Sequence, residues 1–329
     1  MSIRIAGTGS YVPERILSNA DLEKMVETND EWIRTRTGIE ERRIASPEQA
    51  TSDLAYEACL KALDMAGIKG EEVDAIIVGT ITPDYVFPST GCILQDRLGA
   101  KGAFCFDLEA ACSGLLFSLE VAYSLIKTHP NVYRHVLVCG AEKLSCITDW
   151  TNRNTCVLFG DGAGAVLLEN TEDEGADCVV ASDLHTDGGY GDILKMPAGG
   201  SRRPASVESV GAHDHFIHME GKEVFKLAVN AMVGAGKNVL EEAGITPDEV
   251  KLVIPHQANS RIILAVAPRL GVPDERVFMN IGRYGNTSAA SIGLCLDEAF
   301  RAGRIAKGDY VLLTAFGGGL TWGAMLLRF

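Results

Sequence analysis

The sequence has no long uninterrupted apolar run and no pair of cysteines spaced as CxxC. Without a run of roughly 18 apolar residues we expect no membrane-spanning helix. The opening MSIRIAGTGS has no basic region followed by an apolar core, so we expect no secretory signal peptide. The odd set of nine cysteines, mostly among apolar neighbours, is typical of reduced, packed thiols. These features predict a soluble cytoplasmic protein.

Positive charge is also scarce, since 30 Lys and Arg stand against 44 Asp and Glu, a formal net charge of -14. This balance argues against a broad nucleic-acid surface, because binding to phosphates needs clustered Lys and Arg. No GxGxxG motif opens a helix after a first strand, so we expect no nicotinamide cofactor. A metal site is also not expected, because the histidines of HDHFIH end a loop, whereas a catalytic zinc usually draws its ligands from rigid elements. They are His213, His215 and His218.

Continuous apolar runs, separated by helical patterns, indicate strands that are buried on both faces. They are VDAIIVGT (73–80), RHVLVCGAE (134–142), KLVIPHQ (251–257) and DYVLLTAF (309–316). At 329 residues the chain can bury a substantial core without disulfides or metals. The pattern predicts an α/β fold with mixed or parallel sheets. Residues 196–221 are rich in Gly, Pro and Ser and predict a long loop.

An internal repeat divides the chain. AGIKGEEVDAII (66–77) matches AGITPDEVKLVI (243–254) at an offset of 177 residues, and GAVLL (164–168) is echoed by GAMLL (323–327). We therefore predict two similar halves, residues 1–172 and 173–329. The same offset places Cys112 opposite Ala289, so the scaffold is duplicated but the thiol is not.

Cys112 lies in EAACSGL, between an expected strand and an expected helix. At the start of a helix the unpaired N–H groups and the helix dipole favour an anion, which would lower the pKa of the thiol. The small neighbours leave room for a substrate carbonyl, and the Cys112 amide could donate to an oxyanion. A free cysteine is nevertheless most often a small buried hydrophobe, so both interpretations stay open on these residues alone.

Further chemistry is expected at strand ends in the second half. His256 follows an apolar strand in VIPHQAN, and such strand ends open onto ligand crevices, although most histidines are satisfied core or surface residues. Asn286 precedes a helix in YGNTSAAS, where it could be only a cap. Gly318 lies in AFGGGLTWG, where glycines either supply unusual dihedrals or bring an N–H close to a ligand.

Taken in this order, the four motifs resemble those of β-ketoacyl-acyl carrier protein synthase III, the initiating condensing enzyme of bacterial-type fatty acid synthesis, over nearly the whole chain. The resemblance implies a thiolase-like αβαβα layered fold, built from two duplicated halves with mixed sheets. It implies condensation of a short acyl-CoA primer such as acetyl-CoA with malonyl-acyl carrier protein. Decarboxylation drives this Claisen reaction, which gives 3-ketoacyl-acyl carrier protein, CO2 and CoA through an acyl-cysteine. No cofactor is implied, since acyl-CoA is a substrate.

The same resemblance implies roles for individual residues. Cys112, His256 and Asn286 would form the catalytic triad, and the amides of Cys112 and Gly318 would form the oxyanion hole. His256 and Asn286 would act mainly as hydrogen-bond donors to the enolate of the second half-reaction.

Residues for the substrates and partners follow from the resemblance as well. Trp32 and Arg153 would sandwich the CoA adenine, and Arg36 would meet its phosphates. Phe87 would close the acyl pocket from across a dimer interface, which implies a homodimer and short primers. The basic residues that would meet acyl carrier protein are Lys226, Arg261 and Arg269. Lys222 stands where family members often carry an Asn that faces pantetheine.

Three competing interpretations remain at this point. Papain-like hydrolases use Cys, His and Asn in the same chain order, but they carry a Trp near the nucleophile and have a different fold. A relative in the same superfamily could transfer the acyl group to another acceptor. A binding module for acyl carrier protein would require Cys112 to be chemically silent.

Overall fold

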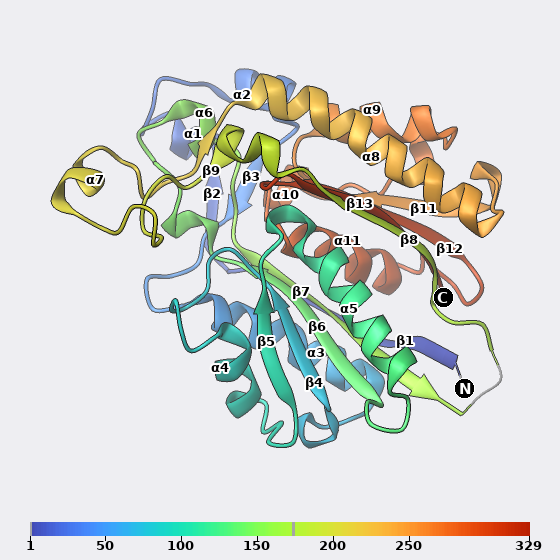
Figure 1. Cartoon of the computed structure of the whole chain (residues 1–329). Helices are drawn as coiled ribbons and strands as arrows, with labels where there is room; N and C mark the ends of the chain where they lie inside the picture. Colours follow the sequence, from blue (N-terminus) through green and yellow to red (C-terminus); the bar gives the residue numbers. More distant parts are fainter. Residues whose placement is uncertain (1, 173–174) are drawn as a thin grey trace.

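The computed structural model describes residues 2–172 and 175–329. Within residues 2–171 the strands form a five-stranded sheet in the order β1-β7-β6-β4-β5 (Figure 1). Their bounds are β1 (Ser2–Tyr11), β4 (Ala75–Gly79), β5 (Phe104–Leu108), β6 (His135–Glu142) and β7 (Gly162–Thr171). Strand β4 is parallel to β5 and β6, whereas β7 is antiparallel to β1 and β6. The expected mixed sheet is therefore confirmed.

A four-stranded sheet forms within residues 179–328, in the order β11-β12-β13-β8. Its strands are β8 (Val179–Thr186), β11 (Val250–Pro255), β12 (Tyr310–Gly317) and β13 (Thr321–Arg328). Strands β11 and β12 are parallel, and the other two neighbouring pairs are antiparallel. This order repeats the β4-β6-β7-β1 part of the first sheet. In place of a counterpart to β5, a single bridge joins Val277 to Val253.

Helices form three layers around the two sheets (Figure 1). One outer layer covers the first sheet with α3 (Thr51–Ala66) and α4 (Thr90–Arg97). Between the sheets lie α5 (Gly114–Thr128) and α11 (Ala290–Arg301). The other outer layer is α8 (Gly221–Ala243), which covers the second sheet and packs against α9 (Ser260–Val266). The layering is αβαβα, as expected.

The central strands explain the continuous apolar runs of the sequence. Along β4, Ile77 packs into the core around α5, while Ile76 and Val78 pack into the core around α3. Along β11, Ile254 and Val253 divide in the same way between the inner core and the core beneath α8. Because successive side chains point to opposite faces, a strand covered by helices on both faces is apolar at every position.

The repeat of the sequence is visible in local conformation. Helices α3 and α8 both end at the glycine of the repeated Ala-Gly-Ile, where Gly67 and Gly244 take left-handed conformations with φ of 71° and 65°. Ala111 and Ser288, which the offset of 177 relates, have the unusual positive φ values of 45° and 47°. The boundary predicted after residue 172 borders residues 173 and 174, which lie outside the described residues, so its position stays a prediction.

Glycines let the central helices approach the first sheet closely. A Cβ on Gly164 of β7 would lie 2.6 Å from Cα of Gly293 in α11. A Cβ on Gly140 of β6 would lie 2.2 Å from the carbonyl oxygen of Ala289. Backbone from the second half of the chain therefore packs directly on the first sheet.

The remaining elements surround these layers. The helices are α1 (Asn19–Leu22), α2 (Asp30–Thr37), α6 (Arg153–Cys156), α7 (Val207–Gly211) and α10 (Ile281–Tyr284). The strands are β2 (Ile16–Ser18), β3 (Glu41–Arg43), β9 (Leu194–Lys195) and β10 (His218–Met219). The prediction of an irregular loop over 196–221 is wrong in part, because α7 forms there and β10 pairs with β9. Ser206 caps α7 by accepting a hydrogen bond from the Ser209 amide, a local signal within the polar composition.

Candidate active site

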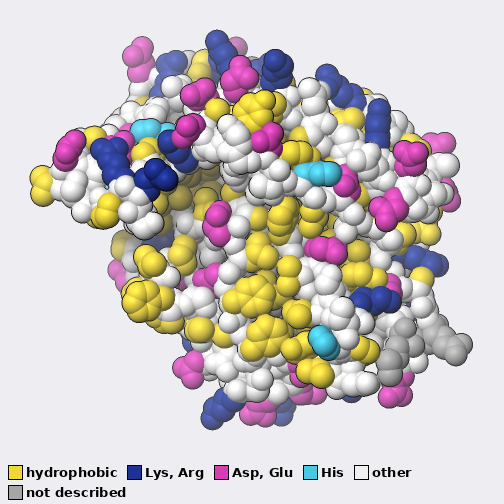
Figure 2. Space-filling model, viewed as in Figure 1, with side chains coloured by type: hydrophobic (Ala, Val, Ile, Leu, Met, Phe, Trp, Pro, Cys, Tyr) yellow, Lys and Arg dark blue, Asp and Glu magenta, His cyan; other side chains and the backbone are white. Residues whose placement is uncertain are grey.

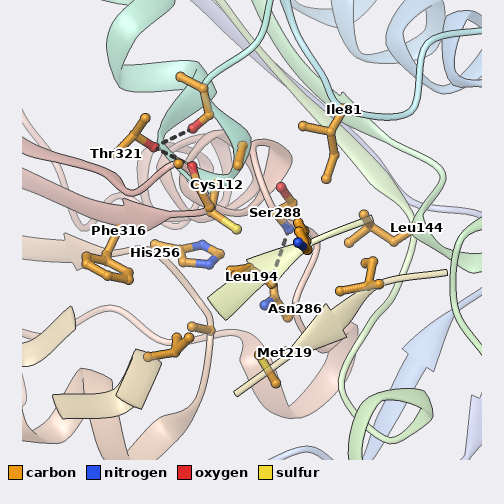
Figure 3. Close-up of a pocket in the computed structure, with 18 of the residues that line it drawn as sticks. Ile81, Cys112, Leu144, Leu194, Met219, His256, Asn286, Ser288, Phe316 and Thr321 are labelled. Atoms are coloured by element: carbon orange, nitrogen blue, oxygen red, sulfur yellow. Dashed lines mark hydrogen bonds between the residues drawn. The ribbon is translucent and has the colours of Figure 1, made fainter. Parts of the chain in front are cut away.

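A cavity of about 1950 Å³ opens where strands of both sheets end. It is lined by the turn before α5, by residues after β11 and β12, and by the turn before α11. Cys112, His256 and Asn286 all line it, so residues far apart in the sequence meet at one place (Figure 3).

Cys112 lies in a short 3-10 turn, Ala111–Ser113, that joins β5 to α5. The neighbouring strand β13 fixes this turn. Thr321 Oγ1 donates to the Ala110 carbonyl oxygen at 2.8 Å (Figure 3). Ser113 Oγ donates to the Thr321 carbonyl oxygen at 3.1 Å. The positive φ of Ala111 turns the chain sharply before the helix. The expected location between a strand and a helix is confirmed.

The protonation of Cys112 differs from the sequence-based expectation. Burial raises the pKa of the Cys112 thiol to about 12, and the charge of Glu142 adds to the increase. Interactions with Ser288 and with the amide of Cys112 itself lower the pKa only in part. The prediction of a lowered pKa is therefore wrong for the structure without substrate, because desolvation of the anion outweighs the stabilising groups.

His256 is held rigidly at the end of β11. Only 1% of its surface is exposed, and its backbone N–H donates to the Thr314 carbonyl oxygen at 2.7 Å. Its Nδ1 lies 2.7 Å from Ser291 Oγ, which also accepts a hydrogen bond from the Gln257 amide at 3.4 Å. If Ser291 donates its hydroxyl hydrogen to Nδ1, the groups in this network are satisfied, and Nε2 of the neutral ring carries the hydrogen.

The charge state of His256 agrees with this tautomer. Burial lowers the pKa of His256 to about 3, so the ring is neutral at physiological pH. Figure 3 shows the ring beside Cys112, on the cavity wall near Phe316. A neutral ring with hydrogen on Nε2 can donate a hydrogen bond to a substrate oxygen, but it offers no base on that side.

Asn286 is oriented by the turn that precedes α11. Its Oδ1 accepts a hydrogen bond from the Ser288 amide at 2.8 Å (Figure 3). This bond leaves the Nδ2 end of the side chain, which can donate, pointing away from the Ser288 amide. Its backbone is fixed as well, since its N–H donates to Leu158 and its carbonyl oxygen accepts from Gly160. The expected alternative, a helix cap, does not describe this residue, because helix α11 starts four residues later at Ala290.

The glycines after β12 lie against the nucleophile turn. A Cβ on Gly317 would lie 2.6 Å from the Cys112 nitrogen, so only glycine permits this approach of β12. Gly318 and Cys112 both line the cavity. Donation by both amides to one oxyanion stays a prediction.

Several residues that support the site were missed in the sequence. Ser291 orients His256, Thr321 fixes the nucleophile turn, and Phe316 forms the cavity wall. Ser288 and the buried Glu142 were missed as well. The offset of 177 relates the pair Gly79 and Gly114 to the pair His256 and Ser291, but the sequence alone does not show that either pair is in contact.

The residues expected to bind CoA lie together around the Trp32 ring. The guanidinium carbon of Arg36 lies 4.9 Å from the centre of the Trp32 ring, and that of Arg153 lies 4.7 Å away. Arg36 also lines the cavity. An adenine stacked on Trp32 would have to displace a guanidinium, so the sandwich stays a prediction.

The other expected binding residues lie at the surface. Phe87 is 84% exposed on the loop before α4. Lys226, Arg261 and Arg269 are exposed on α8, α9 and the turn after α9, and Arg261 and Lys222 line the cavity. Two of these basic side chains, Lys222 and Arg261, are thus both exposed and part of the cavity lining.

Two further features concern ligands and membranes. Within the described residues no three His, Cys, Asp or Glu side chains are arranged to hold a metal ion. The three histidines of HDHFIH have separate partners: His213 lies 3.0 Å from an Asp149 oxygen, His215 2.9 Å from Ser209 Oγ, and His218 3.4 Å from the His213 carbonyl oxygen. In the part of the chain that the structure describes, no helix is long and apolar enough to cross a membrane.

Comparisons with known proteins agree over the whole chain. The family described as 3-oxoacyl-acyl-carrier-protein (ACP) synthase III matches residues 106–188, and the family of its C-terminal region matches residues 240–329. The β-ketoacyl-acyl-carrier-protein synthase III of Caldanaerobacter subterraneus is 55% identical over 324 residues, which cover 98% of this chain and 97% of the relative. That of Desulfotalea psychrophila is 52% identical over 329 residues and covers 100% of each.

Solved structures give the same result. The crystal structure of 3-oxoacyl-acyl-carrier-protein synthase III from Aquifex aeolicus has a TM-score of 0.91 at 49% identity, with 100% of each chain covered. A priming β-ketosynthase from a polyketide biosynthetic pathway has a TM-score of 0.92 at 34% identity, covering 100% of this chain and 96% of that one.

Proposed function

The chain belongs to the 3-oxoacyl-acyl-carrier-protein synthase III family, and from this premise we propose that Cys112 is its nucleophile, with His256 and Asn286 as hydrogen-bond donors. As a member of that family it is an acyltransferase that performs the initiating condensation of fatty acid biosynthesis. One observation carries the assignment of residues: side chains from both halves of the chain line a single cavity.

In the first half-reaction, Cys112 Sγ attacks the thioester carbon of a short acyl-CoA such as acetyl-CoA. The amides of Cys112 and Gly318 donate to the oxyanion, and CoA leaves. The close approach of Gly317 to the Cys112 nitrogen supports this role, because it brings the strand that carries Gly318 to the nucleophile. The acyl group remains on sulfur.

In the second half-reaction, malonyl-acyl carrier protein binds and loses its carboxylate as CO2. His256 Nε2–H and the Asn286 amide donate to the thioester oxygen and stabilise the enolate. Its carbon attacks the acyl-cysteine and forms 3-ketoacyl-acyl carrier protein, and Cys112 leaves as a thiolate that takes up one proton from solvent. The low pKa of His256 supports this role, because the ring stays a neutral donor while negative charge develops beside it. The electron pairs of the bonds that form come from bonds that break in the two thioester substrates, so the proposed reaction needs no cofactor.

Both thioester substrates would enter by the cavity mouth. Acyl-CoA would place its adenine on Trp32 and its phosphates near Arg36, with Arg153 swinging aside. Acyl carrier protein, which is acidic, would meet Lys226, Arg261 and Arg269. This local basic surface offsets the negative charge of the whole chain where the partner docks.

We also propose a homodimer. Strand β5 is the edge of its sheet, and hydrophobic side chains gather over it (Figure 2). The nearby loop exposes Tyr85, Val86 and Phe87 at 62%, 94% and 84%. An exposed apolar edge strand is a ready site for pairing with a second copy. Phe87 would then close the partner's acyl pocket and favour short primers.

The nine free cysteines fit a reducing, cytoplasmic location.

The decisive experiment follows acyl transfer and condensation separately. After incubation with acetyl-CoA, peptide mass spectrometry should find the acetyl group on Cys112. Addition of malonyl-acyl carrier protein should then release CO2 and give 3-ketoacyl-acyl carrier protein. Absence of any adduct on Cys112 would contradict the assignment and favour a binding module. Acetylation followed by transfer to another acceptor, without CO2 release, would favour an acyltransferase of the same superfamily.

A further inference from the structure

Acyl transfer to Cys112, on which this inference rests, releases a proton for which the Cys112, His256 and Asn286 triad offers no good acceptor. Burial raises the pKa of the thiol to about 12, so at neutral pH Cys112 carries its proton when acyl-CoA arrives and must lose it during acyl transfer. Burial lowers the pKa of His256 to about 3, so the ring is too weak a base to hold this proton at neutral pH. Another acceptor must lie close to the sulfur.

Ser288 is the first candidate. It is 1% exposed and lines the cavity, and its Oγ has no hydrogen-bond partner among residues 2–172 and 175–329. Buried hydroxyls without a partner are uncommon and call for an explanation. Figure 3 shows Ser288 beside Cys112. The Ser288 side chain lowers the pKa of Cys112 and that of Glu142, so it acts on both groups.

Glu142 is the second member of the group. It ends β6, is 0% exposed, and accepts hydrogen bonds from Thr82 Oγ1 at 2.6 Å and Thr80 Oγ1 at 3.2 Å. The Ile81 amide donates to it at 3.2 Å. Burial raises the pKa of Glu142 to about 7 against these stabilising bonds. A carboxyl group with such a pKa can accept and return a proton at physiological pH.

The charged and titratable neighbours of Glu142 do not prevent it from accepting a proton. Burial raises the pKa of Cys146 and that of Cys112, and the charge of Glu142 adds to the increase at both thiols. Lys143 is adjacent in sequence, but its Nζ donates to the carbonyl oxygens of Ser46 and Gln49. The ammonium group is therefore engaged elsewhere.

We propose that Ser288 and Glu142 form a proton relay for Cys112. As Cys112 Sγ bonds to the acyl carbon, its S–H bond breaks and the proton passes to Ser288 Oγ, while the Ser288 hydroxyl hydrogen passes to the Glu142 carboxylate. When the C–S bond to CoA breaks, the protonated Glu142 returns its proton through Ser288 to the CoA sulfur. The step converts acyl-CoA and a thiol to acyl-cysteine and CoA thiol, with no net change in protons.

The first test measures the rate of Cys112 acetylation by rapid quench and peptide mass spectrometry. Ser288→Ala and Glu142→Gln should each slow acetylation by about 10- to 100-fold, since general-base catalysis contributes at least this much. The double variant should be no slower than the slower single variant, because both changes interrupt one path. Ser118→Ala is the matched control, since Ser118 Oγ on α5 is also buried without a partner among the described residues. Its rate should not change.

The second test needs no acyl-CoA. Alkylation of Cys112 by iodoacetamide, followed from pH 5.5 to 9, should rise through pH about 7 in the wild type as Glu142 becomes a base. This rise in the alkylation rate through pH about 7 should be absent in Ser288→Ala and in Glu142→Gln. If Glu142 acts only through its charge, Glu142→Gln should instead alkylate faster, because loss of a negative neighbour lowers the pKa of the thiol.

Faster alkylation, unchanged acetylation or additive losses would each overturn the relay. Malonyl decarboxylation, assigned to His256 and Asn286, should stay within about twofold in Glu142→Gln, and a matching loss there would indicate structural damage instead of a relay. If Glu142→Gln does not fold, the pH profile of Ser288→Ala decides alone. A wild type that accepts no acetyl group would refute the proposed function, while the alkylation profile would still decide the relay.

Discussion

The two halves of the chain use matching backbone positions for different purposes. In the first half, Gly79 ends β4 and lies against Gly114, so closely that a Cβ on Gly79 would be 2.8 Å from the Gly114 carbonyl carbon. The offset of 177 carries this pair onto His256 and Ser291, whose side chains are joined by a 2.7 Å contact. At these matching positions the first half has closely packed backbone, whereas the second half has a histidine side chain held by a serine.

The turns before the central helices differ in the same manner. Ala111 and Cys112 precede α5, and the offset matches them to Ser288 and Ala289 before α11. Both turns keep the positive φ at their first position, but only one carries a thiol. The backbone geometry is duplicated while the chemistry is divided, so each half is incomplete without the other.

The largest effect should come from making the two turns alike. Cys112→Ala gives the first turn the residue found at 289, and acetyl transfer should fall by at least about 1000-fold because the nucleophile is gone. Peptide mass spectrometry measures the adduct. Adding Ala289→Cys to this variant should not restore transfer, since the second turn lacks the surroundings of the first. Recovery of activity would show that the halves are interchangeable.

The next effect concerns the donor that the second half alone provides. His256→Ala should slow malonyl decarboxylation by about 100-fold or more, as removal of a donor to a developing oxyanion does. Ser291→Ala should cost less, about 10-fold, because it only frees the ring to turn. Acetylation of Cys112 should be nearly unchanged in both. Loss of acetylation with intact CO2 release would reverse the assigned roles.

The glycine pair of the first half gives a stability prediction. Gly79→Ala should lower the free energy of unfolding by about 1 to 3 kcal/mol, because the new Cβ collides with Gly114 backbone. Urea denaturation measures the change. Gly234→Ala in α8 is the control, since its Cβ would meet nothing within 4 Å and should stabilise the helix slightly. An unchanged stability for Gly79→Ala would mean that the halves tolerate the same side chains.

The last effect is a pH dependence of stability that belongs to one half. Burial holds the pKa of His256 at about 3, below the ordinary 6.5, so between these values the unfolded chain binds a proton that the folded chain does not. His256 thus contributes a rise in stability of about 1.4 kcal/mol per pH unit from pH 3 to 6.5. Replacing His256 by Ala should reduce the slope of stability against pH by this amount. An equal slope in both proteins would contradict the buried neutral ring.

Much of the fold could be predicted because its determinants are local. The apolar runs predicted β4, β6, β11 and β12, since strands covered on both faces have no polar side to interrupt them. The repeat predicted two related sheets. The site residues Cys112, His256 and Asn286 could be selected because each follows or precedes a regular element in a distinctive motif.

The remainder depends on distances between segments that the sequence does not encode locally. The pKa of Cys112 was predicted in the wrong direction because helix position is a local property, whereas desolvation depends on everything packed around the sulfur. Glu142 and Ser288 were missed because 146 residues separate them in the sequence and neither lies in a motif that suggests a proton acceptor. Short elements such as α7 were not predicted because helix caps are weak signals in a sequence.

The glycine contacts between the halves limit how the molecule can move. With Gly293 packed against Gly164 and Ala289 against Gly140, rotation of one half against the other would break backbone packing at the centre of the protein. Hinged closure, common in two-domain enzymes, is therefore unavailable here. Movements that admit substrate must then come from smaller parts, such as the side chains of Arg36 and Lys222, which are exposed and line the cavity. The reacting groups therefore keep their relative positions, and only the surroundings of the cavity can change shape.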